Sequence, residues 1–428
     1  MATSDSAFSL RTGALAIYLP TFLFSLSESA VIPMIPVIAK DLGATLALAG
    51  LVASMLTFGV LLGDVPSAWL VSRIGERAAM VWSGVLALIG VAMGLLAPEP
   101  WTLAIGVFLI GLATATFGLA RHAMLTTYVP LAYRARALSL LGGSLRAGAV
   151  VGPLLSAGLI ATTNSPHAAF WLTAIGTVAT IIVVFFLADP EKVYGAPSLV
   201  TENDGRVVTA GEDEIERESH GIFGTMWSNR GVLLRLGTAS GITGALRATR
   251  AVLLPLWAIS IGMHDAQIAL VIGIATAIDF ALFFFSGQVM DRWGRRWSAV
   301  PAMVIMSGSI ILLSFTHDLT SHVTWFIACA MILALGNGLA SGLLLTLGSD
   351  LAPRANPAPF LGAFRLTIDL GSSAAPLGIT LITAIASLSV AAGALGVVGL
   401  AGAYMMWRYI PRYIPWHPPA KRSSARRI

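Results

Sequence analysis

Long apolar runs separated by short polar stretches make up most of the chain from residue 14 onward. A helix needs about 20 apolar residues to cross the hydrocarbon core of a bilayer. Runs of this kind predict twelve membrane-spanning helices, at 14–38, 45–70, 79–97, 101–126, 138–162, 167–188, 232–261, 267–290, 298–316, 323–347, 358–385 and 388–411. The pattern therefore predicts an all-α membrane protein.

One internal stretch, 189–230, breaks this pattern. Nine acidic residues fall between its start and Glu218. Such a run of charge is usually solvated, so we expect a cytoplasmic linker here. The linker divides the chain into an N-terminal six-helix bundle at 1–188, a C-terminal six-helix bundle at 231–411 and a basic tail at 412–428.

Composition agrees with a membrane protein. Of 428 residues, 56% are hydrophobic and 11% are charged, whereas soluble proteins carry about 25% charged residues. The single cysteine, Cys329, excludes an internal disulfide. The sequence contains no Cys/His cluster at metal spacing, no phosphate-binding loop and no nucleophile elbow. We therefore expect no metal, no cofactor and no enzymatic activity.

The placement of lysine and arginine predicts the orientation in the membrane. With a cytoplasmic N-terminus, the outside loops hold only Lys40. The inside loops, helix ends and tails then hold fifteen basic residues: Arg11, Arg73, Arg77, Arg134, Arg136, Arg292, Arg295, Arg296, Arg354, Arg408, Arg412, Lys421, Arg422, Arg426 and Arg427. Cytoplasmic loops of membrane proteins carry such an excess. We expect a multi-pass protein of the plasma membrane with both termini in the cytoplasm, and its net charge of +5 needs no nucleic-acid partner.

The second half of the chain repeats the first at an offset of 219 residues, without a gap. Three arginines and several glycines and prolines match in register, which shared hydrophobicity alone would not produce. The matches are Pro36 with Pro255, Gly43 with Gly262, Arg73 with Arg292, Gly75 with Gly294, Arg77 with Arg296, Gly143 with Gly362, Arg146 with Arg365 and Gly152 with Gly371. Two parallel six-helix halves, related by an axis along the membrane normal, are the plan of one large class of transporters.

Two loops carry a known motif. The stretch from Gly287 to Arg296, GQVMDRWGRR, resembles the cytoplasmic G-x-L-x-D-R-x-G-R-R loop of the major facilitator superfamily. The equivalent loop after the second helix departs from it at Ser72, where the superfamily has Asp. Asp291 can accept a hydrogen bond from backbone N–H groups at a helix start, and the arginines can bridge to carbonyls or acids of neighbouring helices. We expect a gating role for Arg73, Gly75, Arg77, Asp291, Arg292, Gly294, Arg295 and Arg296.

The fifth helix contains Gly148, Gly152 and Pro153, which resemble the G-x3-G-P core of the antiporter motif in proton-coupled exporters of this superfamily. The resemblance implies an exporter like the 12-helix drug:proton antiporters. An arginine that many drug exporters carry early in the fourth helix is absent, because Val107 occupies its position. The glycines have a structural interpretation as well, since small residues four apart permit close approach of a neighbouring helix.

When the last turn at each span end is set aside, nine acids and arginines fall inside the predicted spans. An unpaired charge at the bilayer centre costs about 2.5–3.5 kcal/mol, so such residues face a cavity or a partner. They lie on helices 1, 2, 4, 5, 7, 8 and 11, whereas helices 3, 6, 9 and 12, the outer helices of the superfamily's fold, carry none. The nine residues are Glu28, Asp64, Arg121, Arg146, Arg247, Arg250, Asp279, Arg365 and Asp369.

Glu28 is the first candidate for proton coupling. It is mid-helix, has no basic neighbour at helical spacing, and can change protonation as a partner moves. Arg247, at the equivalent repeat position, is the candidate partner. The other coupling candidates are Asp64, Asp279 and Asp369.

The arginines and one tryptophan are candidates for the substrate cavity: Arg121, Arg146, Arg247, Arg250, Arg365 and Trp257. The predicted limits place Asp64 and three of these arginines (Arg121, Arg146 and Arg365) nearer the cytoplasmic ends. Structural alternatives stay open. Arg365 can pair with Asp369 at i,i+4 spacing, Arg121 can reach lipid headgroups, Asp64 can bridge toward Arg73, and Trp257 can pack in the core.

The sequence therefore predicts a proton-coupled secondary transporter that works by alternating access and exports small amphipathic compounds or drugs. The alternative is a transporter or flippase of an anionic or lipid-like substrate, because five intramembrane arginines are unusual for a cation site. The expected partners are protons, a small-molecule or lipid-like substrate and the lipid bilayer, and we expect a monomer.

Overall fold

The structure is a computed structural model that describes residues 14–129, 131–186, 199–201, 207–209, 222–353 and 357–415. The N-terminal half contains α1 (Ala14–Val31), the 3-10 turn η1 (Ile32–Met34), α2 (Ile35–Asp41), α3 (Leu46–Ile74), α4 (Glu76–Leu95), α5 (Pro100–Tyr128), α6 (Leu131–Thr163) and α7 (Ala168–Phe186). Twelve helices of the described chain are long and apolar enough to cross a membrane. The all-α membrane fold is confirmed.

The C-terminal half follows a linker of which only a small part is described. The strands β1 (Leu199–Thr201) and β2 (Val207–Thr209) pair antiparallel. The C-terminal elements are α10 (Ile222–Ser228), α11 (Arg230–Val232), the π turn η2 (Leu233–Gly237), α12 (Thr238–Ser260), α13 (Asp265–Trp293), α14 (Arg295–Ser314), α15 (His322–Leu339), α16 (Leu343–Leu351), α17 (Ala358–Ile385) and α18 (Leu388–Tyr413). Most of the acidic run lies outside the described residues, as do Arg11, Arg354, Lys421, Arg422, Arg426 and Arg427.

The 219-residue repeat is visible in the backbone. Both ends of α3 and both ends of α4 shift by 219 to give the ends of α13 and α14. Gly75 and Gly294, which separate these helices, have φ of 78° and 90°. Glycine adopts positive φ without the steric penalty of other residues. The two halves therefore share the same turn at equivalent positions, in addition to the same helix limits.

Two features differ from the predicted limits. α6 begins at Leu131 instead of 138, because a helix continues through the polar interface whereas apolar runs mark only the hydrocarbon part. The tenth span is broken into α15 and α16, and Gly342 between them has φ of 76°. The break between α15 and α16 affects the site described below.

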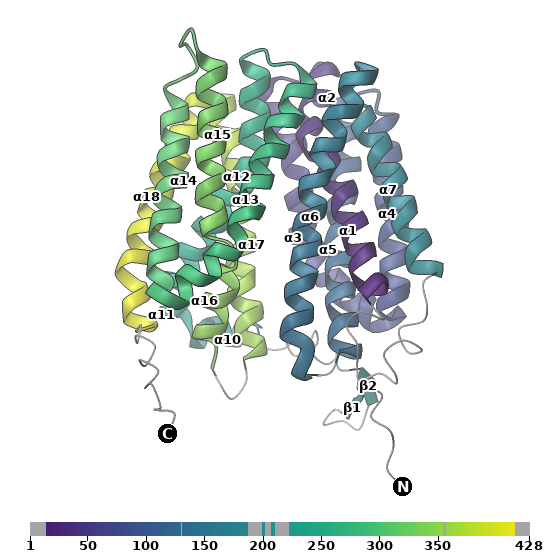
Figure 1. Ribbon diagram of the computed structural model, residues 1–428, viewed down its shortest axis with the longest axis vertical. Helices are drawn as coiled ribbons and strands as arrows, with labels where there is room; N and C mark the ends of the chain where they lie inside the picture. The colour runs from purple at the N-terminus through teal and green to yellow at the C-terminus, as the bar shows by residue number, and fades with distance from the viewer. Residues whose placement is uncertain are drawn as a thin grey trace, which may run out of the picture.

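The helices form two groups, and α4, α7, α14 and α18 lie at the outer sides (Figure 1). Large apolar side chains on these four helices are exposed, among them Trp82, Trp171, Val304 and Val397. This agrees with the absence of mid-span charge on them. We call the end at which α1 begins, α18 ends and the two strands lie the terminal face, and the end with α2 the opposite face.

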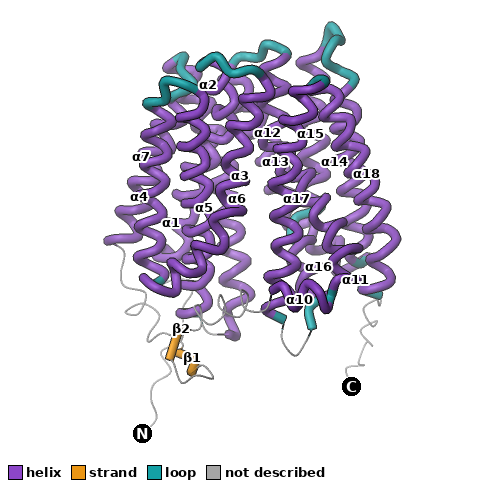
Figure 2. The backbone as a smooth tube through the Cα atoms, turned by 180° about the vertical axis from the view of Figure 1, so that it is seen from behind, coloured by secondary structure: helices purple, strands orange, loops and turns teal. Residues whose placement is uncertain are grey.

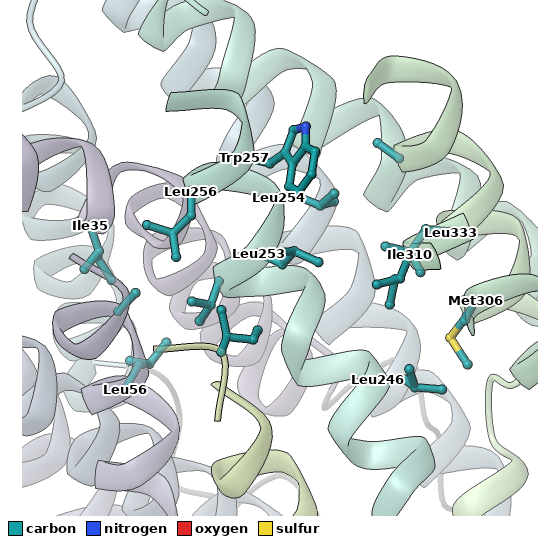
Figure 3. Packing of buried hydrophobic residues seen from close by; sticks show 14 of the residues in the cluster. Ile35, Leu56, Leu246, Leu253, Leu254, Leu256, Trp257, Met306, Ile310 and Leu333 are labelled. Atoms are coloured by element: carbon teal, nitrogen blue, oxygen red, sulfur yellow. The ribbon is translucent and has the colours of Figure 1, made fainter. Parts of the chain in front are cut away.

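Apolar side chains join the two halves near the opposite face. Ile35 and Leu56 of the N-terminal half lie on the side of α12 that carries Leu256, in one continuous buried cluster (Figure 3). A Cβ at Gly50 would lie 3.1 Å from Leu256 Cδ1 and 2.9 Å from Thr380 Oγ1. The two groups of helices separate toward the terminal face (Figure 2).

The glycines of α6 pack directly on α1. A Cβ at Gly148 would lie 2.5 Å from the Phe22 carbonyl oxygen, and one at Gly152 would clash with the Leu26 carbonyl oxygen. Gly371, the repeat equivalent of Gly152, meets the backbone of Gly241 on α12 in the same way. Gly152 and its repeat equivalent Gly371 therefore permit a close helix contact in each half.

Gly152→Ala should lower the unfolding temperature, because the added methyl group forces the backbones of α6 and α1 apart at about 1–3 kcal/mol. Gly158→Ala on the same helix is the control, since a Cβ there meets nothing within 4 Å. Unfolding is followed with a fluorogenic thiol reagent at Cys329, the only cysteine of the chain, which is 1% exposed. Equal unfolding temperatures for the two variants would contradict the packing argument.

Candidate functional site

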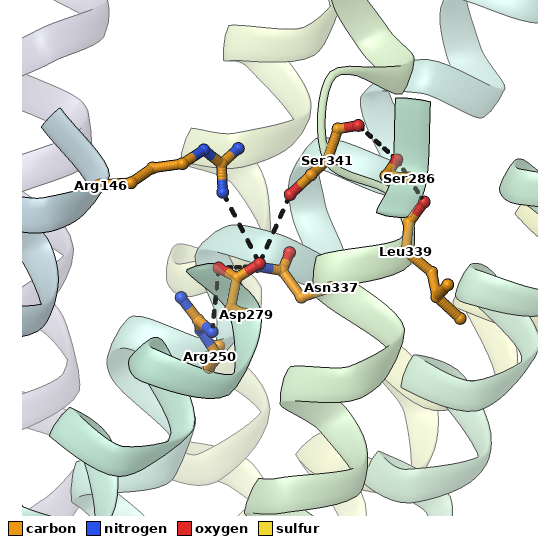
Figure 4. A network of polar contacts seen from close by, with 7 residues as sticks. All are labelled: Arg146, Arg250, Asp279, Ser286, Asn337, Leu339 and Ser341. Carbon is orange, nitrogen blue, oxygen red and sulfur yellow. Dashed lines mark hydrogen bonds and ion pairs between the residues drawn. The ribbon is translucent and has the colours of Figure 1, made fainter. Parts of the chain in front are cut away.

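Asp279 on α13 is the centre of a polar cluster between the two halves. It is 5% exposed. Its carboxylate lies 3.7 Å from Nη1 of Arg146 on α6 and 3.6 Å from Nη1 of Arg250 on α12. Asn337 Nδ2 donates to Asp279 Oδ2 at 2.6 Å, and Ser341 Oγ donates to Oδ1 at 3.5 Å (Figure 4). We call these five residues the Asp279 cluster.

The break between α15 and α16 places the two neutral members of this cluster. Asn337 lies in the last turn of α15 and Ser341 lies in the break itself. Ser286 on α13 donates to the carbonyl oxygens of Leu339 at 2.8 Å and Ser341 at 2.5 Å. It thereby supplies a hydrogen-bond donor to carbonyl groups that lose their helical partners at the break. A side chain of α13 thus stabilises the break between α15 and α16.

Sequence reasoning missed Asn337 and Ser341. The signal was present in three glycines, Gly336, Gly338 and Gly342, within one apolar run. A glycine-interrupted span marks the binding site in several transporter folds. Because the run is apolar throughout, its hydropathy does not indicate the break.

Arg146 on α6 contacts Asp279, and its guanidinium carbon lies 4.6 Å from the ring centre of Phe283. The helix begins at Leu131, seven residues (138 − 131) before the predicted span. These extra residues extend the helix through the polar interface, so the position of Arg146 nearer the cytoplasmic end of the span stays a prediction.

Arg247, one turn before Arg250 on α12, belongs to the same charged region. It interacts electrostatically with Asp279, Arg146 and Arg250. Two arginines thus pair with one carboxylate, and a third interacts with it electrostatically. Arg247 is not among the described partners of Glu28 in this conformation, so its expected pairing with Glu28 in one state of the cycle stays a prediction.

Glu28 on α1 has partners on α5 instead. Thr114 Oγ1 donates to Glu28 Oε1 at 2.8 Å, and Arg121, two turns further along α5, interacts with Glu28 electrostatically. Arg121 Nε is buried and has no hydrogen-bond partner. Arg121 also interacts electrostatically with Arg365 on α17, and the alternative that it reaches lipid headgroups stays a prediction.

Asp64 on α3 and Asp369 share Arg365 on α17. Arg365 Nη2 lies 3.8 Å from Asp64 Oδ1, and its Nε lies 3.6 Å from Asp369 Oδ2. The i,i+4 ion pair on α17 is confirmed, and the Arg365 side chain is 56% exposed. Arg73 lies over the Trp69 ring at 5.7 Å, so the bridge from Asp64 goes to Arg365.

The contacts between the halves follow the repeat. Arg146 and Leu154 on α6 face Asp279 and Gly273 on α13. Their repeat equivalents on α17, Arg365 and Ser373, face α3, and Ser373 Oγ donates to the Thr57 carbonyl oxygen at 3.2 Å. Two equivalent lines of contact, α6 with α13 and α17 with α3, therefore join the halves.

Arginines of the two motif loops contact the ends of neighbouring helices. Arg77 donates from Nε to the Val184 carbonyl oxygen at 3.1 Å and from Nη2 to that of Phe185 at 2.7 Å. Arg295 Nε donates to Asp350 Oδ2 at 2.8 Å. Arg296, the repeat equivalent of Arg77, lies over the Trp407 ring at 5.0 Å, and Arg292 lies over that of Trp293 at 5.4 Å.

Two expected residues behave differently. The Asp291 side chain is 83% exposed and pairs with Arg295 Nη1 at 3.6 Å, and α14 begins without a side-chain cap. The expected bond from a helix start to Asp291 is therefore absent from the described contacts. Trp257 is fully buried and edge-on to His317, with ring centres 5.5 Å apart, so it packs in the core instead of lining a cavity.

Twelve spans in two repeated halves, with intramembrane charges gathered between them, define a membrane transport protein. The chain belongs to the Major Facilitator Superfamily, whose family model matches residues 17–376 and 236–427.

Relatives of this chain are named as transporters of different solutes. Probable anion transporter 6 of Oryza sativa subsp. japonica is 26% identical over 41% of this chain, and a galactose-proton symporter of Escherichia coli (strain K12) is 23% identical over 77% of it. The match spans only 41% of the length of the first relative and 76% of the second.

A solved structure has the same fold. A POT family transporter in complex with a thioalcohol-conjugated peptide superposes with a TM-score of 0.76, covering 94% of this chain and 96% of that one. Its sequence identity is 16%, so the likeness concerns the fold.

Asp279→Asn should destabilise the protein more than Asp291→Asn. Removing one partner of a buried ion pair costs about 3–5 kcal/mol, whereas a substitution at an exposed ion pair changes stability by no more than about 0.5 kcal/mol. The measurement is the temperature at which Cys329 becomes reactive. Adding Arg146→Gln to Asp279→Asn should restore part of the loss, because it removes an uncompensated charge. Indistinguishable unfolding of the two single variants would show that the Asp279 cluster is not stabilised by charge.

Proposed function

We propose that this protein is a proton-coupled transporter of organic anions that works by alternating access. The observation that carries the proposal is the surplus of positive charge around Asp279, where Arg146, Arg247 and Arg250 interact with a single carboxylate. With all four groups ionised, the net charge is +2 (3 − 1).

A positive centre of this kind favours one class of substrate. Taking charges out of water is unfavourable unless they are paired, and a bound anion supplies the missing negative charge. A cation would meet repulsion from the same groups. The names of the anion transporters among the relatives support the same class.

Export of amphipathic compounds is the second candidate, and the glycine contacts of α6 with α1 favour it. Those glycines lie where the exporters of the superfamily have their antiporter motif. They support a direction of transport and do not bear on the charge of the substrate, so an exported organic anion satisfies both observations.

Alternating access assigns a role to the contacts between the halves. The apolar contact at the opposite face separates and the terminal faces approach in the second conformation. With the termini in the cytoplasm, as the basic residues favour, the structure is the inward-facing state. The motif loops then act as gates at the terminal face, and the 189–230 linker joins two six-helix bundles of one monomer.

Purified protein in proteoliposomes should transport small organic anions in preference to cations. With an imposed proton gradient, we expect uptake of labelled benzoate or succinate and none of tetraphenylphosphonium. Galactose is the neutral control. Saturable transport of tetraphenylphosphonium without any anion transport would contradict the proposed substrate class and favour cationic drug export.

Glu28→Gln should abolish transport driven by a proton gradient while exchange of substrate without a gradient survives. Gln preserves size and hydrogen bonding to Thr114 but does not change charge, so the two conformations no longer differ in proton affinity. A ligand shifts a two-state equilibrium only through differential affinity, and a proton obeys the same rule. Glu99→Gln, at an exposed position between α4 and α5, is the matched control. Proton-driven transport by Glu28→Gln at the wild-type rate would transfer the coupling role to Asp64 or Asp369.

A further inference from the structure

We infer that Arg146 and Arg250 form a clamp that holds one anionic group of the substrate between the two halves, with Asp279 as the internal counter-ion behind them. This inference rests on the proposed transport of organic anions. Figure 4 shows the two guanidinium groups approaching Asp279 from different elements, α6 of the N-terminal half and α12 of the C-terminal half.

The guanidinium groups of Arg146 and Arg250 have N–H donors that the described hydrogen bonds do not use. Their distances of 3.7 and 3.6 Å to Asp279 exceed those of charge-assisted hydrogen bonds, about 2.7–2.9 Å. Arg250 Nη1 is buried and has no hydrogen-bond partner. The described contacts of the Arg146 guanidinium are the ion pair with Asp279 and the Phe283 ring. Both groups are attracted to Asp279 without being satisfied by it.

Asp279 is more deeply buried than the two arginines that it pairs with. Its side chain is 7% exposed, compared with 22% for Arg146 and 21% for Arg250. The short hydrogen bond from Asn337 holds the carboxylate against the break in the tenth span. A ligand that enters between the halves therefore meets the guanidinium groups, while Asp279 stays fixed.

The chemistry of guanidinium selects the ligand. Its planar fork of donors matches the two oxygens of a carboxylate or a phosphate. The Phe283 ring, 4.6 Å from the Arg146 guanidinium carbon, offers an apolar surface beside that anion. The clamp thus fits an anionic group attached to an apolar body.

Arg365 is the natural control because it occupies the position in α17 that Arg146 occupies in α6. It also bridges the halves, through Asp64 at 3.8 Å. Unlike Arg146, however, it has a second acid, Asp369, within 3.6 Å. Two acids around one arginine leave no surplus of positive charge for a ligand.

The test is anion binding to purified protein, measured as the rise in the temperature at which Cys329 becomes reactive. The probes are benzoate, succinate and inorganic phosphate, with tetraphenylphosphonium as the cation, and each shift is taken relative to the same variant without probe. We expect Arg146→Gln and Arg250→Gln each to weaken the binding of the stabilising anion by about 10-fold or more, since a hydrogen bond to a charged group is lost. Arg365→Gln should lose less anion affinity than either of these variants, because two acids already compensate the Arg365 charge.

Asp279→Asn separates the clamp from a purely structural cluster. Removal of the internal counter-ion raises the positive charge at the arginines, so the anion should bind more tightly although the empty protein is less stable. A merely structural role predicts weaker binding. If a glutamine variant is unfolded, Arg146→Lys or Arg250→Lys replaces it. These keep the charge and lose the fork, and they should bind the anion more weakly than wild type.

The outcomes distinguish the clamp from the proposed function. If the wild-type protein binds none of the three anions, both fail. If it binds an anion and the Arg146 and Arg250 variants bind it as wild type does, the clamp fails and anion transport stands. Equal losses in the Arg365 and Arg146 variants also overturn the clamp. A benzoate-specific or phosphate-specific effect of the two arginines identifies which anionic group the clamp holds.

Discussion

Compensation of charge inside an apolar medium is the constraint on which the rest of this structure depends. An uncompensated charge in the bilayer is expensive, so every helix that carries one must bring it to a partner. Asp279 meets Arg146 and Arg250, Glu28 meets Thr114 and Arg121, and Arg365 meets Asp64. The helices without such residues are free to face lipid, and α4, α7, α14 and α18 do so. The arrangement of the bundle thus follows from where charge is placed along the chain.

The same constraint explains how the halves hold together and still separate. The ion pairs that cross between them, Arg146 with Asp279 and Arg365 with Asp64, are longer than hydrogen bonds and include partly exposed arginines. A buried ion pair contributes little net stability because the cost of desolvation offsets the attraction, even though removal of one partner is costly. Separating the two partners is therefore compatible with a conformational cycle. In the proposed cycle, the apolar contact around Leu256 at the opposite face separates while the terminal face closes. Two halves that exchange one contact for the other are what alternating access requires.

Most of the fold could be predicted from the sequence, because it depends on quantities that a sequence displays directly. Run length gives the spans, the 219-residue register gives the repeat, and the absence of charge gives the outer helices. The pairings within the site could not be predicted. They depend on a break hidden in an apolar run, as for Asn337, and on rotation about the helix axis. That rotation directs Arg247 toward Asp279 in this conformation, and no one-dimensional pattern of charge specifies it.

The repeat is most informative where it diverges. The position of Asp64 in the first half corresponds to Phe283 in the second (283 − 219 = 64), and the acid of the second half stands one turn earlier, at Asp279. Arg365 therefore faces an acid where Arg146 faces a ring. Around Arg365, two acids compensate one arginine, whereas around Asp279 one acid interacts with three arginines. A backbone that is nearly symmetric thus has an asymmetric distribution of charge. This asymmetry contributes to the positive character of the centre of the bundle, because in a strictly repeated pair of halves Arg146 would be compensated by acids as Arg365 is.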